Sequence, residues 1–175
     1  MITDTGFPRA DAENDFLRAR RREAAGRVGG WLRREAGGRR LLVLDEVVSA
    51  LGRRGQRRLG LQTIRLDTIV GTLDARRDFD RRFRPATNRL RSRWVDLALA
   101  QRRGEALPPI EVYRVGRCHF VEDGHHRVSI ARATRQKTID AYVSEVLTAS
   151  SSGASPREVP STCGVPGPET SRTVG

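Results

Sequence analysis

This chain of 175 residues has a single lysine, few aromatic residues and only two cysteines, and each shortage narrows the class of protein. The two cysteines, Cys118 and Cys163, lie far apart in the sequence and provide neither a disulfide framework nor a cysteine-based zinc cluster. No apolar run follows a basic start, and none is long enough to cross a bilayer. We therefore expect a cytoplasmic protein with no membrane partner.

The charge is strongly positive, because 33 basic residues stand against 21 acidic ones and give a formal net charge of +12. Such an excess favours nucleic acid, nucleotides or acidic partners through attraction to phosphate. Lys137 is the only lysine, however, and coding bias in a GC-rich genome explains this preference for arginine as well as selection for binding does. With five Phe, two Tyr and two Trp, the chain has few side chains to stack on the bases of a single strand.

Residues 1–58 are predicted to form an N-terminal extension of two helices and a basic hinge. The first helix is indicated by apolar residues that recur at near-helical spacing, which are Leu17, Ala24, Val28, Trp31 and Leu32. The second is indicated by Leu44, Val47, Val48 and Leu51 at i, i+3, i+4 and i+7, and it should end near Gly52. The arginine-rich run 53–58 then has the composition of a hinge.

Residues 59–147 are predicted to form one domain of the mixed α+β class, with a small mixed sheet and flanking helices. The expected order is a strand through Ile64 with a turn at Gly71, a charged loop over 74–80, and a helix from Leu90 that ends before Pro108. A hairpin of strands 110–115 and 118–122, a helix near 126–134 and a strand over 139–146 follow. Ser, Gly, Pro and Thr dominate residues 148–175, which indicates a disordered tail.

The segment Asp123-Gly124-His125-His126-Arg127 carries the strongest functional signal. An apolar run leads into it and a helix-like stretch leads out, so Gly124 permits a tight turn and Asp123 can cap the new helix. The first N–H groups of such a helix attract an anion, which Arg127 can clamp with two hydrogen bonds. The simpler interpretation is an ordinary strand-to-helix turn whose arginine solvates the surface.

The order of these elements resembles the ParB/sulfiredoxin superfamily, known for its ParB-like N-terminal or nuclease domain, over roughly residues 61–146. The resemblance is carried by LPPIEVY at 107–113, FVEDGHHRVSIA at 120–131 and IDAYV at 139–143. In chromosome-partitioning ParB proteins the matching turn is Gly-Glu-Arg-Arg, part of a pocket for CTP and magnesium. The resemblance implies that Gly124, His126 and Arg127 contact phosphate, and that Arg76 and Arg77, in a stretch similar to the family's Gln-Pro-Arg loop, add secondary contacts.

Other members of the superfamily imply different chemistry at this turn. Sulfiredoxin has Gly-Gly-Cys-His-Arg there, and His125 stands where its catalytic cysteine would be, so we do not expect reductase activity. Free-serine kinases of this fold have Asp-Gly-His-Thr-Arg and transfer phosphate from ADP. The expected helix-turn-helix domain of ParB does not follow residue 146, so a sliding DNA clamp is not implied.

Three functional hypotheses follow. The first is a domain that binds a nucleotide or a nucleic-acid phosphate through Gly124, His125, His126 and Arg127, in a DNA-associated regulatory or partition-like role. Its cofactors would be Mg²⁺ with CTP, ATP or ADP, and Asp123 is a candidate magnesium ligand, although helix capping explains that residue equally well. The second is a nucleotide hydrolase or a phosphotransferase acting on a small hydroxyl compound, with Glu122 as the candidate general base. The third is a metal-dependent nuclease.

Overall fold

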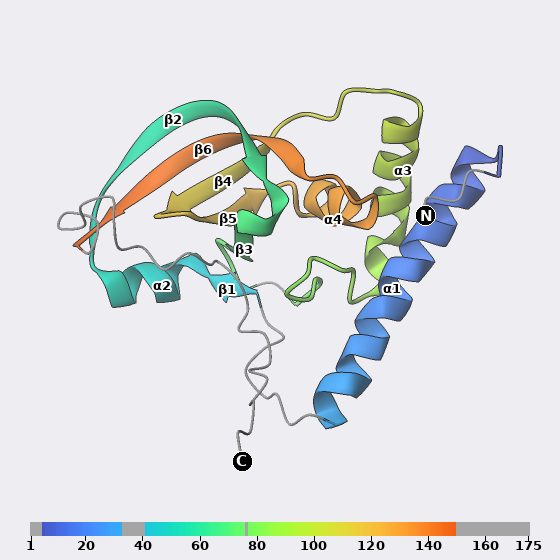
Figure 1. The fold of residues 1–175 in the computed structure, drawn as a ribbon, viewed down its shortest axis with the longest axis horizontal. Helices are drawn as coiled ribbons and strands as arrows, with labels where there is room; N and C mark the ends of the chain where they lie inside the picture. Colours follow the sequence, from blue (N-terminus) through green and yellow to red (C-terminus); the bar gives the residue numbers. More distant parts are fainter. Residues whose placement is uncertain (1–4, 33–40, 76, 150–175) are drawn as a thin grey trace, which may run out of the picture.

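The computed structural model describes residues 5–32, 41–75 and 77–149, with side chains in the first helix up to residue 25, and Figure 1 shows their arrangement. The described chain is a mixed α+β structure around a six-stranded sheet with the strand order β1-β3-β5-β4-β6-β2, which confirms the predicted class. The strands are β1 (Leu42–Val43), β2 (Arg53–Arg65), β3 (Ile69–Thr72), β4 (Ile110–Val115), β5 (Cys118–Asp123) and β6 (Thr138–Thr148). The helices are α1 (Pro8–Leu32), α2 (Leu44–Leu51), α3 (Arg91–Arg102) and α4 (His125–Ala133).

The sheet is mixed, as the sequence predicts. β4 and β5 form the expected antiparallel hairpin around Gly116-Arg117, and β5 also pairs in parallel with β3. β4 pairs in parallel with β6, and β6 pairs antiparallel with β2 along almost the whole of both strands. β2 and β6 form the long arch across the top of Figure 1.

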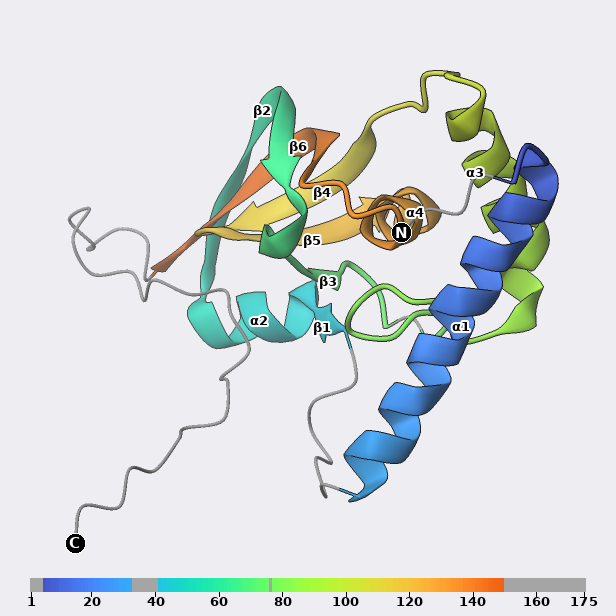
Figure 2. The same cartoon turned by 45° about the vertical axis from the view of Figure 1, so that its right-hand side comes forward.

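Three helices are stacked on one face of the sheet. Val112 and Val121 of the sheet pack against Val128 of α4 in the largest cluster of buried residues. On the far side of α4, Trp94 of α3 and Phe16 of α1 meet in a second cluster, with ring centroids 5.6 Å apart. Figures 1 and 2 both show this order outward from the sheet, first α4, then α3, then α1. Trp94 is a fully buried core residue, whereas the side chain of Trp31 lies outside the described residues.

The other face of the sheet is covered at one end by α2. Leu44 and Val48 of this helix pack on Val115, Phe120 and Val146 in a third cluster of buried residues. The i, i+4 spacing of the two helical residues places both on the same side of α2, so the short helix buries one narrow stripe. The sequence prediction for this helix is confirmed, including its end at Gly52, whose N–H donates to the Val48 carbonyl.

The predicted hinge at residues 53–58 is wrong, because this run is the first part of β2. Arg53 to Arg58 pair with Thr148 to Ser144 of β6, and the predicted boundary after residue 58 falls inside β2. The error has a physical cause: glycine and arginine are typical of hinges, but an edge strand that exposes its side chains accepts them as well. β2 is such an edge strand in the described sheet.

Two smaller predictions are also corrected. Gly71 is not in a turn but inside β3, where a Cβ would come within 2.7 Å of the Phe120 ring. In α1 the predicted apolar stripe is displaced, because Leu17 is 40% exposed whereas Ala12 and Phe16 are fully buried. β6 continues to Thr148, the first residue of the predicted disordered tail, and residues 150–175 of that tail lie outside the described residues.

Across the residues that the structure describes, no helix combines the length and apolar character of a transmembrane span.

Candidate phosphate site at the start of helix α4

Gly124 joins β5 to α4 and begins the helix in a left-handed conformation. Its φ is +100°, and no side chain caps the helix at this position. A Cβ would come within 2.8 Å of the Ile110 Cβ, so both the backbone angle and the packing require glycine here. The tight turn predicted at Gly124 is confirmed. The first turn of α4 therefore follows the strand directly, with the positive end of its dipole at the turn.

Asp123 does not cap α4, so that sequence prediction is wrong. Asp123 is the last residue of β5, where it pairs with Glu111, and the capping position falls on the next residue. Its side chain is 63% exposed, and its Oδ2 accepts a charged hydrogen bond from Arg127 one helical turn later. The carboxylate therefore faces a guanidinium and not the peptide N–H groups of the helix.

The side chain of Arg127 is only 12% exposed, and its guanidinium donates to three acceptors of the protein itself. Its Nη1 donates to the carbonyl oxygens of Pro108 and Pro109 at 2.5 and 2.6 Å, and its Nη2 donates to Asp123. The two prolines leave the chain after α3 and enter β4, so Arg127 fastens this connection to α4. Since Nη1 alone holds the two carbonyls, Nη2 is the nitrogen whose partner is a solvent-exposed carboxylate.

The two histidines of the turn have different environments. His125 is 5% exposed; its Nε2 lies 2.7 Å from the Thr72 hydroxyl, and its ring stacks against Phe79 at 6.0 Å. That ring is part of the core and does not reach the surface of the turn. His126 is half-buried, and its ring meets the edge of Phe79 with centroids 5.4 Å apart.

The loop between β3 and α3 packs over the first turn of α4, as the sequence predicts for its charged part. The buried rings of Phe79 and Phe83 both contact His125, and Phe79 also contacts His126. The Asp80 carboxylate stabilises the loop by accepting hydrogen bonds from the N–H groups of Arg82 and Arg84 at 2.9 and 2.8 Å. Arg77, one of the predicted phosphate contacts, is exposed on this loop. Arg76, the other, lies outside the described residues.

Several arginines of the helices bind backbone carbonyl groups. Arg132 donates to the carbonyls of Leu66 and Ile69 at 2.9 and 2.7 Å and lies over the Phe83 ring, 5.1 Å from its centroid. Burial lowers the pKa of the Arg132 guanidinium. Arg20 of α1 likewise donates to the Ala86 carbonyl at 2.7 Å. Part of the positive charge therefore fastens loops and is not directed at a ligand.

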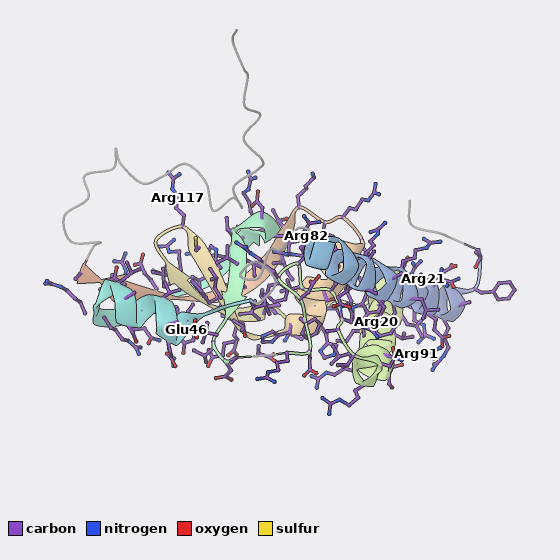
Figure 3. The ribbon with its side chains drawn as sticks, turned by 90° about the horizontal axis from the view of Figure 1, so that it is seen from below. Arg20, Arg21, Glu46, Arg82, Arg91 and Arg117 are labelled. Atoms are coloured by element: carbon purple, nitrogen blue, oxygen red, sulfur yellow. The ribbon has the colours of Figure 1, made fainter. Side chains whose placement is uncertain are left out.

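The remaining basic residues are spread over the molecule. In Figure 3, Arg117 lies at the tip of the β4–β5 hairpin, Arg82 lies on the loop, and Arg20, Arg21 and Arg91 lie around α1 and α3. In the part of the chain that the structure describes, the arginines labelled in Figure 3 do not gather in a single stripe for a nucleic-acid backbone.

Glu122 lies on the opposite face of the sheet from α4. Successive residues of a strand alternate between faces, so Val121 packs in the core beneath α4 while Glu122 points away from it. Glu122 instead lines a pocket with Tyr113 and Tyr142. The structure therefore does not bring the candidate general base together with the candidate phosphate site.

The described residues do not form a protein-built magnesium site. Among them no group of three or more His, Cys, Asp or Glu side chains is placed to hold a metal ion. The Asp123 carboxylate is engaged by the Arg127 guanidinium, which is an unfavourable neighbour for a divalent cation. The magnesium role of Asp123 stays a prediction, and no step of the proposed function depends on it.

Comparisons with known proteins add no family assignment. The chain matches no protein-family model, and no curated protein or solved structure shows significant similarity to it.

Sequence reasoning missed the residues that surround Glu122. Glu111 and Tyr113 are two residues apart in β4, and Tyr142 and Ser144 are two residues apart in β6. Because the two strands are paired in register, all four side chains point to the same face of the sheet. The available signal is that these polar and aromatic residues alternate with the apolar residues Ile110, Val112, Ala141 and Val143. It indicates a solvated sheet face, but not that the two strands are neighbours.

Proposed function

We propose that this protein is a ParB/sulfiredoxin-like domain that binds a phosphate of a nucleotide or of nucleic acid at the first turn of α4 without catalysing a reaction on it. The observation that carries the proposal is the uncapped start of α4 at Gly124, beside a guanidinium whose Nη2 has a single exposed carboxylate as its partner. A phosphate is the same kind of anionic acceptor as that carboxylate, with two non-bridging oxygens in a phosphodiester and three in a terminal phosphate.

Binding would proceed by exchange of one anion for another. The carbonyl oxygens of Pro108 and Pro109 hold Arg127 in place, so the guanidinium needs no new conformation to meet a phosphate. Asp123 would swing into solvent, which its exposure permits. Peptide N–H groups of the first turn, the His126 ring and Arg77 from the loop would complete the contacts. A DNA-associated regulatory or partition-like role agrees with such a site.

The absence of a catalytic role is proposed on geometric grounds. A general base must lie within hydrogen-bonding reach of the hydroxyl that it activates, or one water away. Glu122, the candidate base, faces the pocket on the other side of the sheet. We therefore rank binding above phosphoryl transfer for this turn.

Calorimetric titration with CTP, ATP, ADP and a short DNA duplex tests the proposal. We expect at least one of these ligands to bind the wild type. Arg127→Ala should weaken that binding by about 2 kcal/mol, because a charged hydrogen bond to the phosphate is lost. Asp123→Asn should strengthen it several-fold, because the competing carboxylate is removed. Arg117→Ala, which removes the same charge from the hairpin tip, should change the affinity less than twofold.

The Asp123 variant separates the two interpretations of that residue. If Asp123→Asn weakens nucleotide binding in the presence of magnesium, the carboxylate acts with the metal and the exchange of anions is wrong. If no phosphate ligand binds the wild type, or if Arg127→Ala and Arg117→Ala weaken binding equally, the site at α4 is refuted. Thermal unfolding of each variant shows that the protein remains folded.

A further inference from the structure

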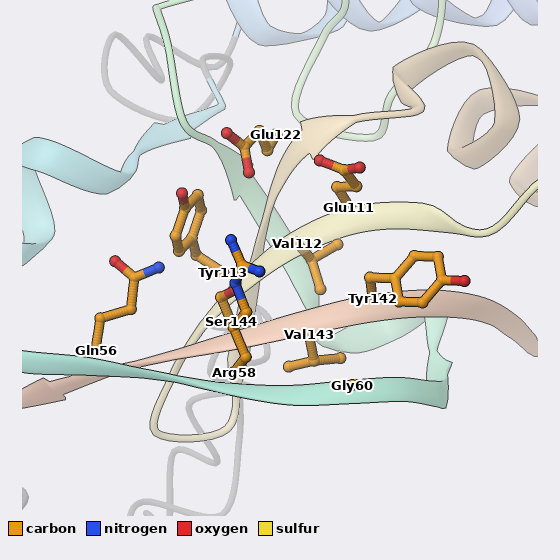
Figure 4. A pocket seen from close by; sticks show the side chains of 10 residues that line it. All are labelled: Gln56, Arg58, Gly60, Glu111, Val112, Tyr113, Glu122, Tyr142, Val143 and Ser144. Atoms are coloured by element: carbon orange, nitrogen blue, oxygen red, sulfur yellow. The ribbon is translucent and has the colours of Figure 1, made fainter.

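A second candidate site lies on the same face of the sheet as α2, in the part that this helix does not cover. A pocket of about 400 Å³ opens there above β2, β4 and β6, as Figure 4 shows. This volume is within the range typical of small-molecule sites in proteins. Because it lies across the sheet from α4, the pocket shares no lining residue with the candidate phosphate site.

Four strands contribute the side chains that matter in this pocket. Register places Glu111 of β4 beside Tyr142 of β6, and Tyr113 of β4 beside Ser144 of β6. Arg58 of β2 is the next residue across from Ser144. Glu122 comes from the end of β5, where a register shift interrupts the β4–β5 pairing. In Figure 4 the carboxylates of Glu111 and Glu122 lie together at one end, with the two tyrosine rings on either side.

The charge in the pocket is opposite to that of the whole protein. Two carboxylates, from Glu111 and Glu122, and one guanidinium, from Arg58, give a formal charge of −1 in a chain of net charge +12. Within the described residues, no hydrogen bond or ion pair is formed by any of these three side chains. Elsewhere acidic side chains bind arginine: Glu145 accepts from both Arg57 and Arg114, at 2.5 and 2.6 Å.

The tyrosine rings add a surface that suits a cation on an aliphatic chain. Tyr142 is 52% exposed, so its ring is accessible to a ligand in the pocket. The face of such a ring attracts ammonium and guanidinium groups and also packs against methylene groups. Tyr113, on the same face of the sheet, lines the other side of the pocket.

We propose that this pocket binds a small basic amino acid. The side-chain ammonium or guanidinium of the ligand would lie between Glu111 and Glu122, its methylene groups would cross the tyrosine rings, and its carboxylate would bind Arg58. A ligand of this class carries two positive groups and one negative group, which complements the charge of the pocket. Nucleotides and other phosphates do not fit, because the two glutamates repel them.

Thermal shift and calorimetry with five probe compounds test the inference. L-arginine and L-lysine carry all three groups, agmatine and cadaverine lack the carboxylate, and L-norleucine lacks the side-chain cation. We expect L-arginine or L-lysine to raise the melting temperature, because a ligand that binds only the folded state stabilises it. The decarboxylated amine should bind at least fivefold more weakly than its parent amino acid, and L-norleucine should bind more weakly still.

Substitutions locate the binding within the pocket. Glu122→Gln and Glu111→Gln should each weaken the binding of the amino acid at least tenfold. Arg58→Gln should abolish the preference for the amino acid over its decarboxylated form while it leaves the affinity for that form within twofold. Arg54→Gln removes the same charge from the same strand outside the pocket and should leave every affinity unchanged.

Several outcomes would overturn the inference. They are no binding of either amino acid, equal affinity for an amino acid and its decarboxylated form, or equal effects of Arg58→Gln and Arg54→Gln. Binding of a nucleotide that Glu122→Gln strengthens would also refute it. None of these results bears on the site at α4, whose test depends on Asp123 and Arg127.

Discussion

Position 124 shows how two separate constraints fix one residue. Gly124→Ala imposes a left-handed φ on a residue with a side chain and also forces its Cβ into Ile110. We expect a loss of about 3 kcal/mol in the free energy of unfolding, from backbone strain and overpacking together. Gly104→Ala is the control, because Gly104 has a φ of +77° with open space around it. It should cost only about 1 kcal/mol in urea unfolding; equal costs would show that the contact with Ile110 is unimportant.

His119 is a buried residue of β5. Its Nδ1 lies 2.9 Å from the Thr68 hydroxyl, which itself donates to the Arg65 carbonyl, so the neutral ring with a proton on Nδ1 fits this chain of hydrogen bonds. Burial, with a smaller contribution from the nearby Arg114 charge, lowers the pKa of His119 from 6.5 to about 4.

This lowered pKa predicts how stability depends on pH. The unfolded chain takes up a proton at this histidine near pH 6.5, whereas the folded protein does so only near pH 4. Stability should therefore be complete above pH 7 and fall as the pH drops from 6.5 towards 4, by up to about 3 kcal/mol. His119→Asn should show a smaller loss over this range in urea titrations. Between pH 5 and 6.5, carboxylates contribute little to the change. If the free energy of unfolding of His119→Asn has the same slope against pH there as the wild type, the assignment to His119 is wrong.

At the scale of elements, α3 is joined to α4 by one buried hydrogen bond. The indole N–H of Trp94 donates to the Ser129 hydroxyl at 2.9 Å. Trp94→Phe removes the donor and leaves a small cavity, and Ser129→Ala leaves the indole N–H without this acceptor; each should cost about 2 kcal/mol. The double variant should be more stable than the sum of the two losses predicts, by about 1 kcal/mol. Strict additivity in chemical denaturation would show that the bond contributes nothing.

The sequence predicts best the helices and strands that are marked by residues within or next to the element itself. The hairpin, α4 and β6 were placed within two residues or so, because glycines, prolines and apolar periodicity bound each of them. β2 was shortened because the basic composition of residues 53–58 conceals its pairing with β6. β1 was missed because two residues carry no period, and its pairing with β3 is a tertiary contact.

In the candidate phosphate site, too, the features set by neighbouring residues are predictable and those set by tertiary contacts are not. The turn at Gly124 follows from residues that are adjacent in the sequence, so it could be predicted. The partners of Arg127 could not, because Pro108 and Pro109 come from a connection that only the folded chain brings near α4. Nor could the separation of Glu122 from the turn, which depends on the sheet face to which each residue of β5 points.

At the scale of the whole molecule, α1 belongs to the same packed unit as the sheet. Phe16 is fully buried between Trp94 and its neighbours in the cluster that joins α1, α3 and α4. Phe16→Ala should therefore lower the midpoint of a single unfolding transition, with a loss of about 3–4 kcal/mol. Phe7→Ala, at a residue that is 72% exposed, should change stability by less than about 0.5 kcal/mol. Separate transitions by circular dichroism and tryptophan fluorescence would show instead that α1 unfolds independently.

The edge position of β2 has a practical consequence for handling the protein. In the described sheet this long strand pairs on one side only, and it carries exposed arginines, among them Arg53 and Arg54. We expect repulsion between the like charges of two such strands to oppose edge-to-edge joining of two molecules. Polyanions carried through purification would neutralise that repulsion, so preparations freed of nucleic acid should remain monodisperse at concentrations where crude ones precipitate.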